Sequence, residues 1–166
     1  MDREKFRLCI RLGDKMSEKF HRFSKITKLP GKPVKILVVD DDESIRSMLI
    51  ELFQNLNCVV HSAKNGEEAF QIYRNQSDGF DLVILDFQMP VMGGKAAFAK
   101  IRSIEPTQKI LMISGALKDS DLQKIISKKH VAFLSKPFHI DDIVEELNKL
   151  RDKQPSCTDK SGRILD

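Results

Sequence analysis

Four apolar segments of this 166-residue sequence each end in polar side chains that can take part in chemistry. In chain order these ends are the triplet Asp40-Asp41-Asp42, then Asp86, Ser114 and Lys136. A carboxylate at the end of a buried apolar strand is costly unless it has a partner or a task. We therefore predict that acids, a hydroxyl and an amine come together in one functional site.

The chemistry of such a set follows from its charges. Clustered carboxylates repel one another unless a proton or a cation lies between them. Oxygen ligands without histidine or thiolate partners suit a hard divalent ion, with Mg²⁺ the first choice. Asp86 can then attack a phosphoryl group as a nucleophile. Lys136 can neutralise a phosphoryl oxygen, and Ser114 can donate its hydroxyl to another.

Strand-like and helix-like patterns alternate along the chain and give these residues their positions. The predicted strands are residues 35–39, 59–63, 81–86, 109–113 and 131–135. The predicted helices cover residues 45–56, 66–75, 95–105, about 120–129 and 140–150. Strict alternation of nearly continuous apolar strands with helices predicts an α/β fold with a parallel sheet covered on both faces. In such folds the ligand site lies at the carboxyl ends of the strands.

Four motifs carry a resemblance to a known family. They are residues 35–42, 86–94, 113–115 and 133–138, in order and at family-like separations. With them, residues 34–150 resemble the receiver domain of bacterial two-component response regulators, of the chemotaxis-type, single-domain kind. The resemblance implies a flavodoxin-like, doubly wound sheet of five parallel strands in the order 2-1-3-4-5, with five helices.

The resemblance also implies roles for single residues. Asp86 would be the phospho-acceptor. Asp41 would bind Mg²⁺ directly and Asp40 mainly through water, while Asp86 and the backbone carbonyl of Gln88 would complete the protein ligands. A register with Asp41 and Asp42 as the acidic pair stays open, although Asp42 also suits an N-cap of the helix that follows.

The remaining implied roles concern the response to phosphorylation. Ser114 fills the family's hydroxyl position, Phe133 its aromatic switch position, and Lys136 its lysine position. The Lys136-Pro137 bond is expected to be cis. Phosphorylation would draw Ser114 toward the new oxygens and let Phe133 turn into the vacated space.

We therefore expect a stand-alone phospho-receiver that is not an enzyme, beyond catalysing its own phosphorylation and dephosphorylation. Its partners would be a sensor histidine kinase or a histidine phosphotransfer protein, and an unknown downstream target. A weak homodimer is also open. Two alternatives remain: an aspartyl-phosphate phosphatase or phosphotransferase, whose usual Asp-x-Asp is missing at Asp86-Phe87-Gln88, and a receiver-like interaction module that no longer takes phosphate.

The chain divides into three parts. Residues 1–33 are a basic, predicted helical extension and linker, residues 34–151 the receiver, and residues 152–166 a tail expected to be disordered. Residues 1–32 hold 10 Lys+Arg against 4 Asp+Glu, so the basic character belongs to the extension. No DNA-binding domain is expected, because no helix-turn-helix follows the receiver. No signal-peptide or membrane-span pattern is seen, which makes the cytoplasm the expected location.

Overall fold

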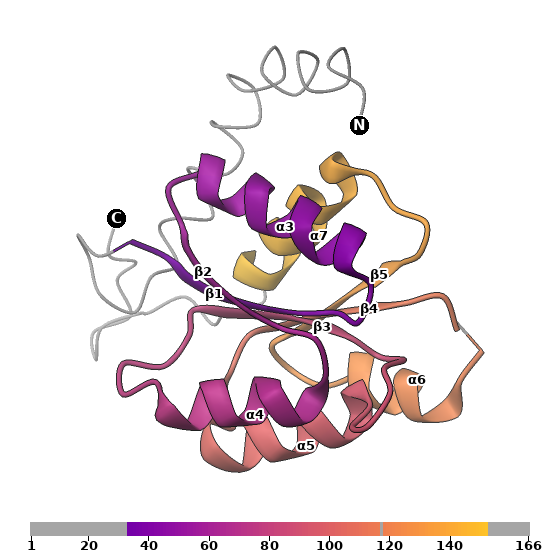
Figure 1. Cartoon of the computed structure of the whole chain (residues 1–166). Coiled ribbons are helices and arrows are strands. Elements are labelled where there is room, and N and C mark those ends of the chain that lie inside the picture. Colours follow the sequence, from indigo (N-terminus) through magenta and orange to yellow (C-terminus); the bar gives the residue numbers. More distant parts are fainter. Residues whose placement is uncertain (1–32, 117, 153–166) are drawn as a thin grey trace, which may run out of the picture.

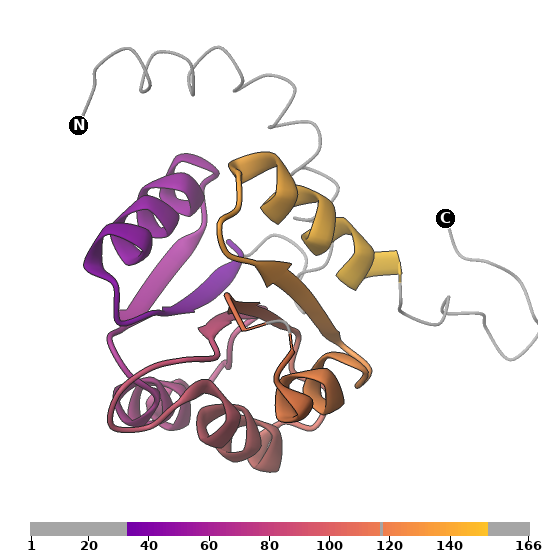
Figure 2. The same cartoon turned by 90° about the vertical axis from the view of Figure 1, so that its right-hand side faces the viewer.

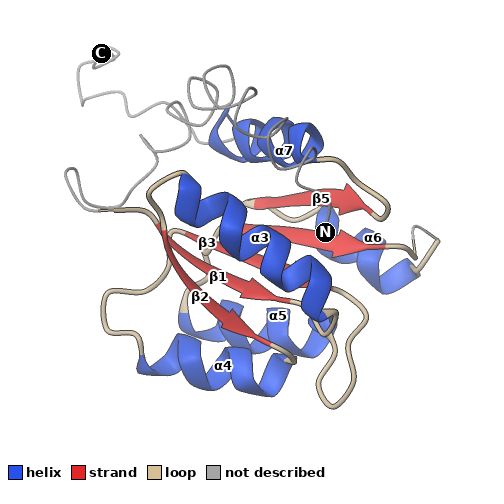
Figure 3. Cartoon of the chain, turned by 45° about the horizontal axis from the view of Figure 1, so that its top comes forward, coloured by secondary structure: helices blue, strands red, loops and turns tan. Residues whose placement is uncertain are grey.

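The computed structural model describes residues 33–116 and 118–152, where five strands alternate with five helices (Figure 3). The strands are β1 (Lys35–Val39), β2 (Val59–Ala63), β3 (Leu82–Asp86), β4 (Ile110–Ser114) and β5 (Val131–Ser135). The helices are α3 (Glu43–Asn55), α4 (Gly66–Asn75), α5 (Gly94–Ile104), α6 (Ser120–Ile126) and α7 (Ile140–Asp152). The predictions made for residues 1–32 and 153–166 lie outside the described residues.

All strand pairs are parallel, and the sheet order is β2-β1-β3-β4-β5, as predicted. Figure 1 shows α3 and α7 on one face of the sheet and α4, α5 and α6 on the other. The chain leaves β1 for the edge strand β2 and then returns to the other side of β1 to form β3. The point between β1 and β3 is therefore the topological switch point, where ligands bind in this class of fold.

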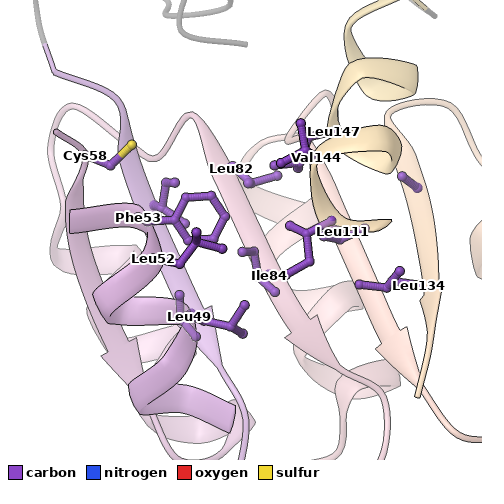
Figure 4. Packing of buried hydrophobic residues seen from close by; sticks show 14 of the residues in the cluster. Leu49, Leu52, Phe53, Cys58, Leu82, Ile84, Leu111, Leu134, Val144 and Leu147 are labelled. Carbon is purple, nitrogen blue, oxygen red and sulfur yellow. The ribbon is translucent and has the colours of Figure 1, made fainter. Parts of the chain in front are cut away.

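Two hydrophobic clusters hold the layers together, one on each face of the sheet. In β1, Ile36 and Val38 face the cluster under α3 and α7, and Leu37 and Val39 face the cluster under α4, α5 and α6. Figure 4 shows the first cluster, in which Leu49, Leu52 and Phe53 of α3 pack on the strands. Burial on both faces explains why the strands are nearly continuous apolar runs instead of alternating ones.

Local signals set the helix starts. Asp42, Asn65 and Asp119 are the N-caps of α3, α4 and α6, and each side chain accepts hydrogen bonds from backbone N–H groups of the first turn. The cap at Asp42 confirms the N-cap role suggested for this residue by the sequence. Among the described residues, no helix has the length and apolar character needed to cross a membrane.

One helix end was predicted wrongly. α6 ends at Ile126 and not near Lys129, because the N–H of Lys128 bonds back to the carbonyl of Ile125 in a tighter turn. His130 then takes a φ of 60°, which turns the chain into β5. Figure 2, turned by a quarter from Figure 1, shows the short α6 beside α5 on its side of the sheet.

Candidate functional site

The strand register brings the predicted site residues to one edge of the sheet. Val39 pairs with Leu85, so Asp40 follows β1 directly beside Asp86, the last residue of β3. Asp86 in turn pairs with Ile113 of β4, which places Ser114 one residue further along the next strand. Ser114 pairs with Ser135, and Lys136 follows it.

Lys136 joins the two buried carboxylates. Its Nζ lies 3.0 Å from Oδ2 of Asp40 and 2.7 Å from Oδ2 of Asp86. Asp40 is 1% exposed and Asp86 4% exposed, so both charges depend on protein partners for compensation. The remaining carboxylate oxygens accept backbone hydrogen bonds, from Asp42 N to Asp40 Oδ1 at 2.9 Å and from Gln88 N to Asp86 Oδ1 at 3.1 Å.

Burial and pairing act in opposite directions on the charged groups. Burial raises the pKa of Asp40 above its usual range and outweighs the hydrogen bonds from Lys136 and from Asp42 N–H, while the charge of Asp86 raises it further. For Lys136, burial lowers the pKa, but the hydrogen bonds and charges of Asp86 and Asp40 more than offset this, so its pKa is raised. The lysine is therefore held as an ammonium ion, and the pair of acids has one cation between them.

A third carboxylate completes a candidate cation site. Asp40, Asp41 and Asp86 each offer an oxygen, and these oxygens lie within 4.8 Å of one another. Asp42 is turned away, because its Oδ1 accepts from Ser44 N at 2.8 Å as the cap of α3. The acidic pair beside Asp86 is thus Asp40 with Asp41. Three carboxylates at this spacing fit a hard divalent cation such as Mg²⁺.

The other predicted residues lie at the same edge. Ser114 is fully buried, and its Oγ accepts from Ala116 N at 3.0 Å, a bond that does not use the hydroxyl proton. The carbonyl of Ser114 accepts from Lys136 N at 3.0 Å. Phe133 is half-buried against the cluster under α4, α5 and α6. The Lys136-Pro137 bond is cis, as predicted.

The geometry leaves several roles as predictions. It brings Asp40, Asp41, Asp86 and Lys136 together, but phosphorylation of Asp86, the switch movement of Ser114 and Phe133, and metal binding by the carbonyl of Gln88 are not tested by it.

Sequence reasoning missed two residues that support the site. Arg46 donates from Nη1 to the carbonyl of Asp40 at 2.8 Å and to that of Asp41 at 3.4 Å, which fixes the acidic loop. The sequence could have indicated this role, because Arg46 lies one turn into α3 and helical side chains lean toward the N-terminus of their helix. Gly94 begins α5 against the end of β3, where a Cβ would lie 2.2 Å from the backbone oxygen of Asp86.

Comparisons with known proteins agree with the fold. The family model of the response regulator receiver domain matches residues 36–148. Chemotaxis protein CheY of Bacillus subtilis is 35% identical over 116 residues, which are 69% of this chain and 95% of that protein. The sensor kinase CckA of Brucella abortus is 27% identical over 139 residues, but the match covers 84% of this chain and only 15% of the kinase.

A solved structure shows the same architecture. One chain of the CheX-CheY-BeF3-Mg²⁺ complex from Borrelia burgdorferi superimposes with a TM-score of 0.65 at 28% identity. The match covers 73% of this chain and 91% of that one.

Proposed function

The chain belongs to the response regulator receiver family, and on this premise we propose that it is a phosphorylation switch with Asp86 as the phospho-acceptor. A sensor histidine kinase or a histidine phosphotransfer protein would supply the phosphoryl group. The observation that carries the proposal is the convergence of three carboxylates, with the ammonium of Lys136 bonded to two of them.

In the proposed reaction a carboxylate oxygen of Asp86 attacks the phosphorus of a phosphohistidine. The new O–P bond forms as the P–N bond breaks, and the imidazole nitrogen keeps the electron pair. Lys136 lies 2.7 Å from an Asp86 oxygen, so its charge is already in place to neutralise the phosphoryl oxygens. The hydroxyl of Ser114, at the next strand end, would donate to one of these oxygens in the product.

Asp40, Asp41 and Asp86 would hold the Mg²⁺ ion. When bound, the ion supplies positive charge that offsets the carboxylates and attracts the oxygens of the donor's phosphoryl group. The similar CheX-CheY complex from Borrelia burgdorferi contains BeF3 and Mg²⁺, which supports the choice of metal.

The output of the switch is a change in binding to another protein. Phosphorylation adds charge and acceptor oxygens at Asp86, and Ser114 and Phe133 would carry the change along β4 and β5. The chain catalyses at most its own phosphorylation and dephosphorylation in this proposal. The buried free thiol of Cys58 fits a reducing compartment, so a cytoplasmic location is part of the proposal.

Intact-mass measurement after incubation with acetyl phosphate and Mg²⁺ tests the proposal. We expect a phosphoryl adduct on the wild type that is stable in acid, labile in base, and absent from Asp86→Asn. Asp42→Asn is the matched control, because it removes a neighbouring carboxylate but keeps a good N-cap. Its adduct should match that of the wild type.

Two other outcomes identify the alternatives. Release of phosphate over many turnovers would indicate an aspartyl-phosphate phosphatase. A folded wild-type protein that gains no adduct from acetyl phosphate or from phosphorylated histidine proteins would indicate an interaction module without phosphorylation.

A further inference from the structure

The loop between β3 and α5, residues 87–93, contains a turn with an unusual residue at its centre. Met92 N donates to the carbonyl of Pro90 at 2.8 Å, which makes a three-residue turn around Val91. Val91 has a φ of 67°. A three-residue turn with positive φ at its centre is the rare, strained form of the γ-turn, and a β-branched side chain makes it less favourable still.

Close packing on both sides holds this turn in place. Gly94 N donates to the carbonyl of Phe87 at 3.0 Å, which closes the base of the loop. Gly66, the first residue of α4, donates from its N–H to the carbonyl of Met92 at 3.0 Å. A Cβ at Gly66 would lie 2.6 Å from that carbonyl oxygen, so α4 rests directly on the loop. Strained residues persist where the surrounding structure determines them in this way, often at functional sites.

The side chain of Val91 is not buried in the hydrophobic core of the protein. It is 89% exposed, the highest value among the exposed large hydrophobic residues in the described part of the chain. Glycine or asparagine would suit the positive φ better, and a polar residue would suit the exposure better. Neither folding nor packing accounts for a valine here.

The position of the loop beside Asp86 suggests a role for the exposed side chain of Val91. Asp86 ends β3 at the base of this same loop and is 4% exposed, so a protein donor that brings its phosphoryl group to the carboxylate comes next to the loop. The loop has no charged residue: its sequence is Phe-Gln-Met-Pro-Val-Met-Gly. A donor surface that complements it is therefore apolar.

We propose that Val91 is an apolar docking contact for the protein that phosphorylates Asp86, a protein with an apolar surface beside its phosphohistidine. This inference rests on the proposed function. A small donor such as acetyl phosphate needs only the carboxylates and Lys136, so the contact serves protein donors alone. The strained turn keeps the side chain presented before the donor arrives, which reduces the ordering cost of docking.

The test compares two donors on the same variants. The protein donor is a phosphorylated histidine-bearing fragment of a sensor kinase, chosen because it phosphorylates the wild-type chain, and the small donor is acetyl phosphate. Val91→Asn removes the apolar group and tolerates the positive φ, whereas Val91→Ile keeps the apolar group. We expect Val91→Asn to slow transfer from the protein donor roughly tenfold, the effect of losing one buried valine contact. Its rate with acetyl phosphate should be unchanged, and Val91→Ile should resemble the wild type.

Ile104→Asn is the matched control, since Ile104 is another exposed hydrophobic residue at the far end of α5. It should leave both rates unchanged. Equal slowing of Val91→Asn with both donors, or no slowing with the protein donor, overturns the docking role. If neither acetyl phosphate nor any phosphorylated histidine-bearing fragment phosphorylates the wild type, the proposed function is contradicted instead.

Discussion

Replacing Lys136 with methionine removes the only cation that, in the described part of the chain, bonds to the carboxylates of Asp40 and Asp86. Methionine has a similar length and no charge, so packing along the stem of the side chain is largely kept. The two carboxylates, 2% and 5% exposed in their side chains, would then face each other without compensation. We expect the variant to be less stable than the wild type in metal-free buffer near neutral pH.

The size of the loss follows from burial. Removing one partner of a buried ion pair costs about 3–5 kcal/mol. The side chain of Lys136 is 24% exposed, so water already screens part of the interaction and the low end, about 3 kcal/mol, applies here. Lys149→Met is the matched control. Lys149 also contacts two acids, Glu145 and Glu146, but on the exposed surface of α7, and its loss should leave the unfolding midpoint unchanged.

Urea unfolding with EDTA present measures the loss, and its pH dependence checks the cause. The folded protein raises the pKa of Asp40 above the ordinary value of 3.8, and losing the hydrogen bond from Lys136 raises it further. An acid with a raised folded pKa takes up its proton in the folded state first. Stability is therefore gained as pH falls through the folded pKa toward 3.8, and the deficit of Lys136→Met should shrink in that window.

A second variant separates charge from packing. Adding Asp86→Asn to Lys136→Met leaves one buried carboxylate instead of two, so part of the lost stability should return. The reasoning is refuted if Lys136→Met unfolds at the wild-type urea concentration, or if neither low pH nor Asp86→Asn reduces its deficit.

Two further predictions concern packing and reactivity. Gly94→Ala should lower the free energy of unfolding by about 1–3 kcal/mol, because the added Cβ would meet backbone atoms of Asp86 and Phe87 at 2.2 and 2.7 Å. Gly115→Ala is the control, because a Cβ there has no neighbour within 4 Å, and it should match the wild type in the same urea titration. Burial raises the pKa of the Cys58 thiol to about 12, so the folded protein should protect this thiol from iodoacetamide at pH 8. In a Cys9→Ser/Cys157→Ser background, labelling should therefore be slow in the folded protein and fast in urea. Equal labelling in both states would contradict the burial of Cys58.

The sequence predicted the sheet well because its signals are strong and local. Apolar runs and helical stripes alternate without interruption, and parallel strands then have to end at one edge. That rule alone brings Asp86, Ser114 and Lys136 together, before any distance is known. The order of the strands came from the family resemblance, and the structure confirms it.

The details that the sequence left open or missed depend largely on three-dimensional contacts. The triplet Asp40-Asp41-Asp42 allowed two acidic pairs, and the contacts of Lys136 with Asp40 and of Asp42 with the start of α3 favour Asp40 with Asp41. The early end of α6 follows from the turn into β5 at His130. The positive φ of Val91 contradicts the preference of a β-branched residue, so no local rule predicts it.

The hydrogen bond from Lys136 N to the carbonyl of Ser114 has a consequence for protein engineering. This bond joins the backbone of Ser114, which carries the hydroxyl group, to the backbone of Lys136, which carries the ammonium group. A designer who shifts one of these strands to retune the site will shift the other with it. The two strand ends are therefore best exchanged between receivers as one cassette, with both residues taken from the same parent.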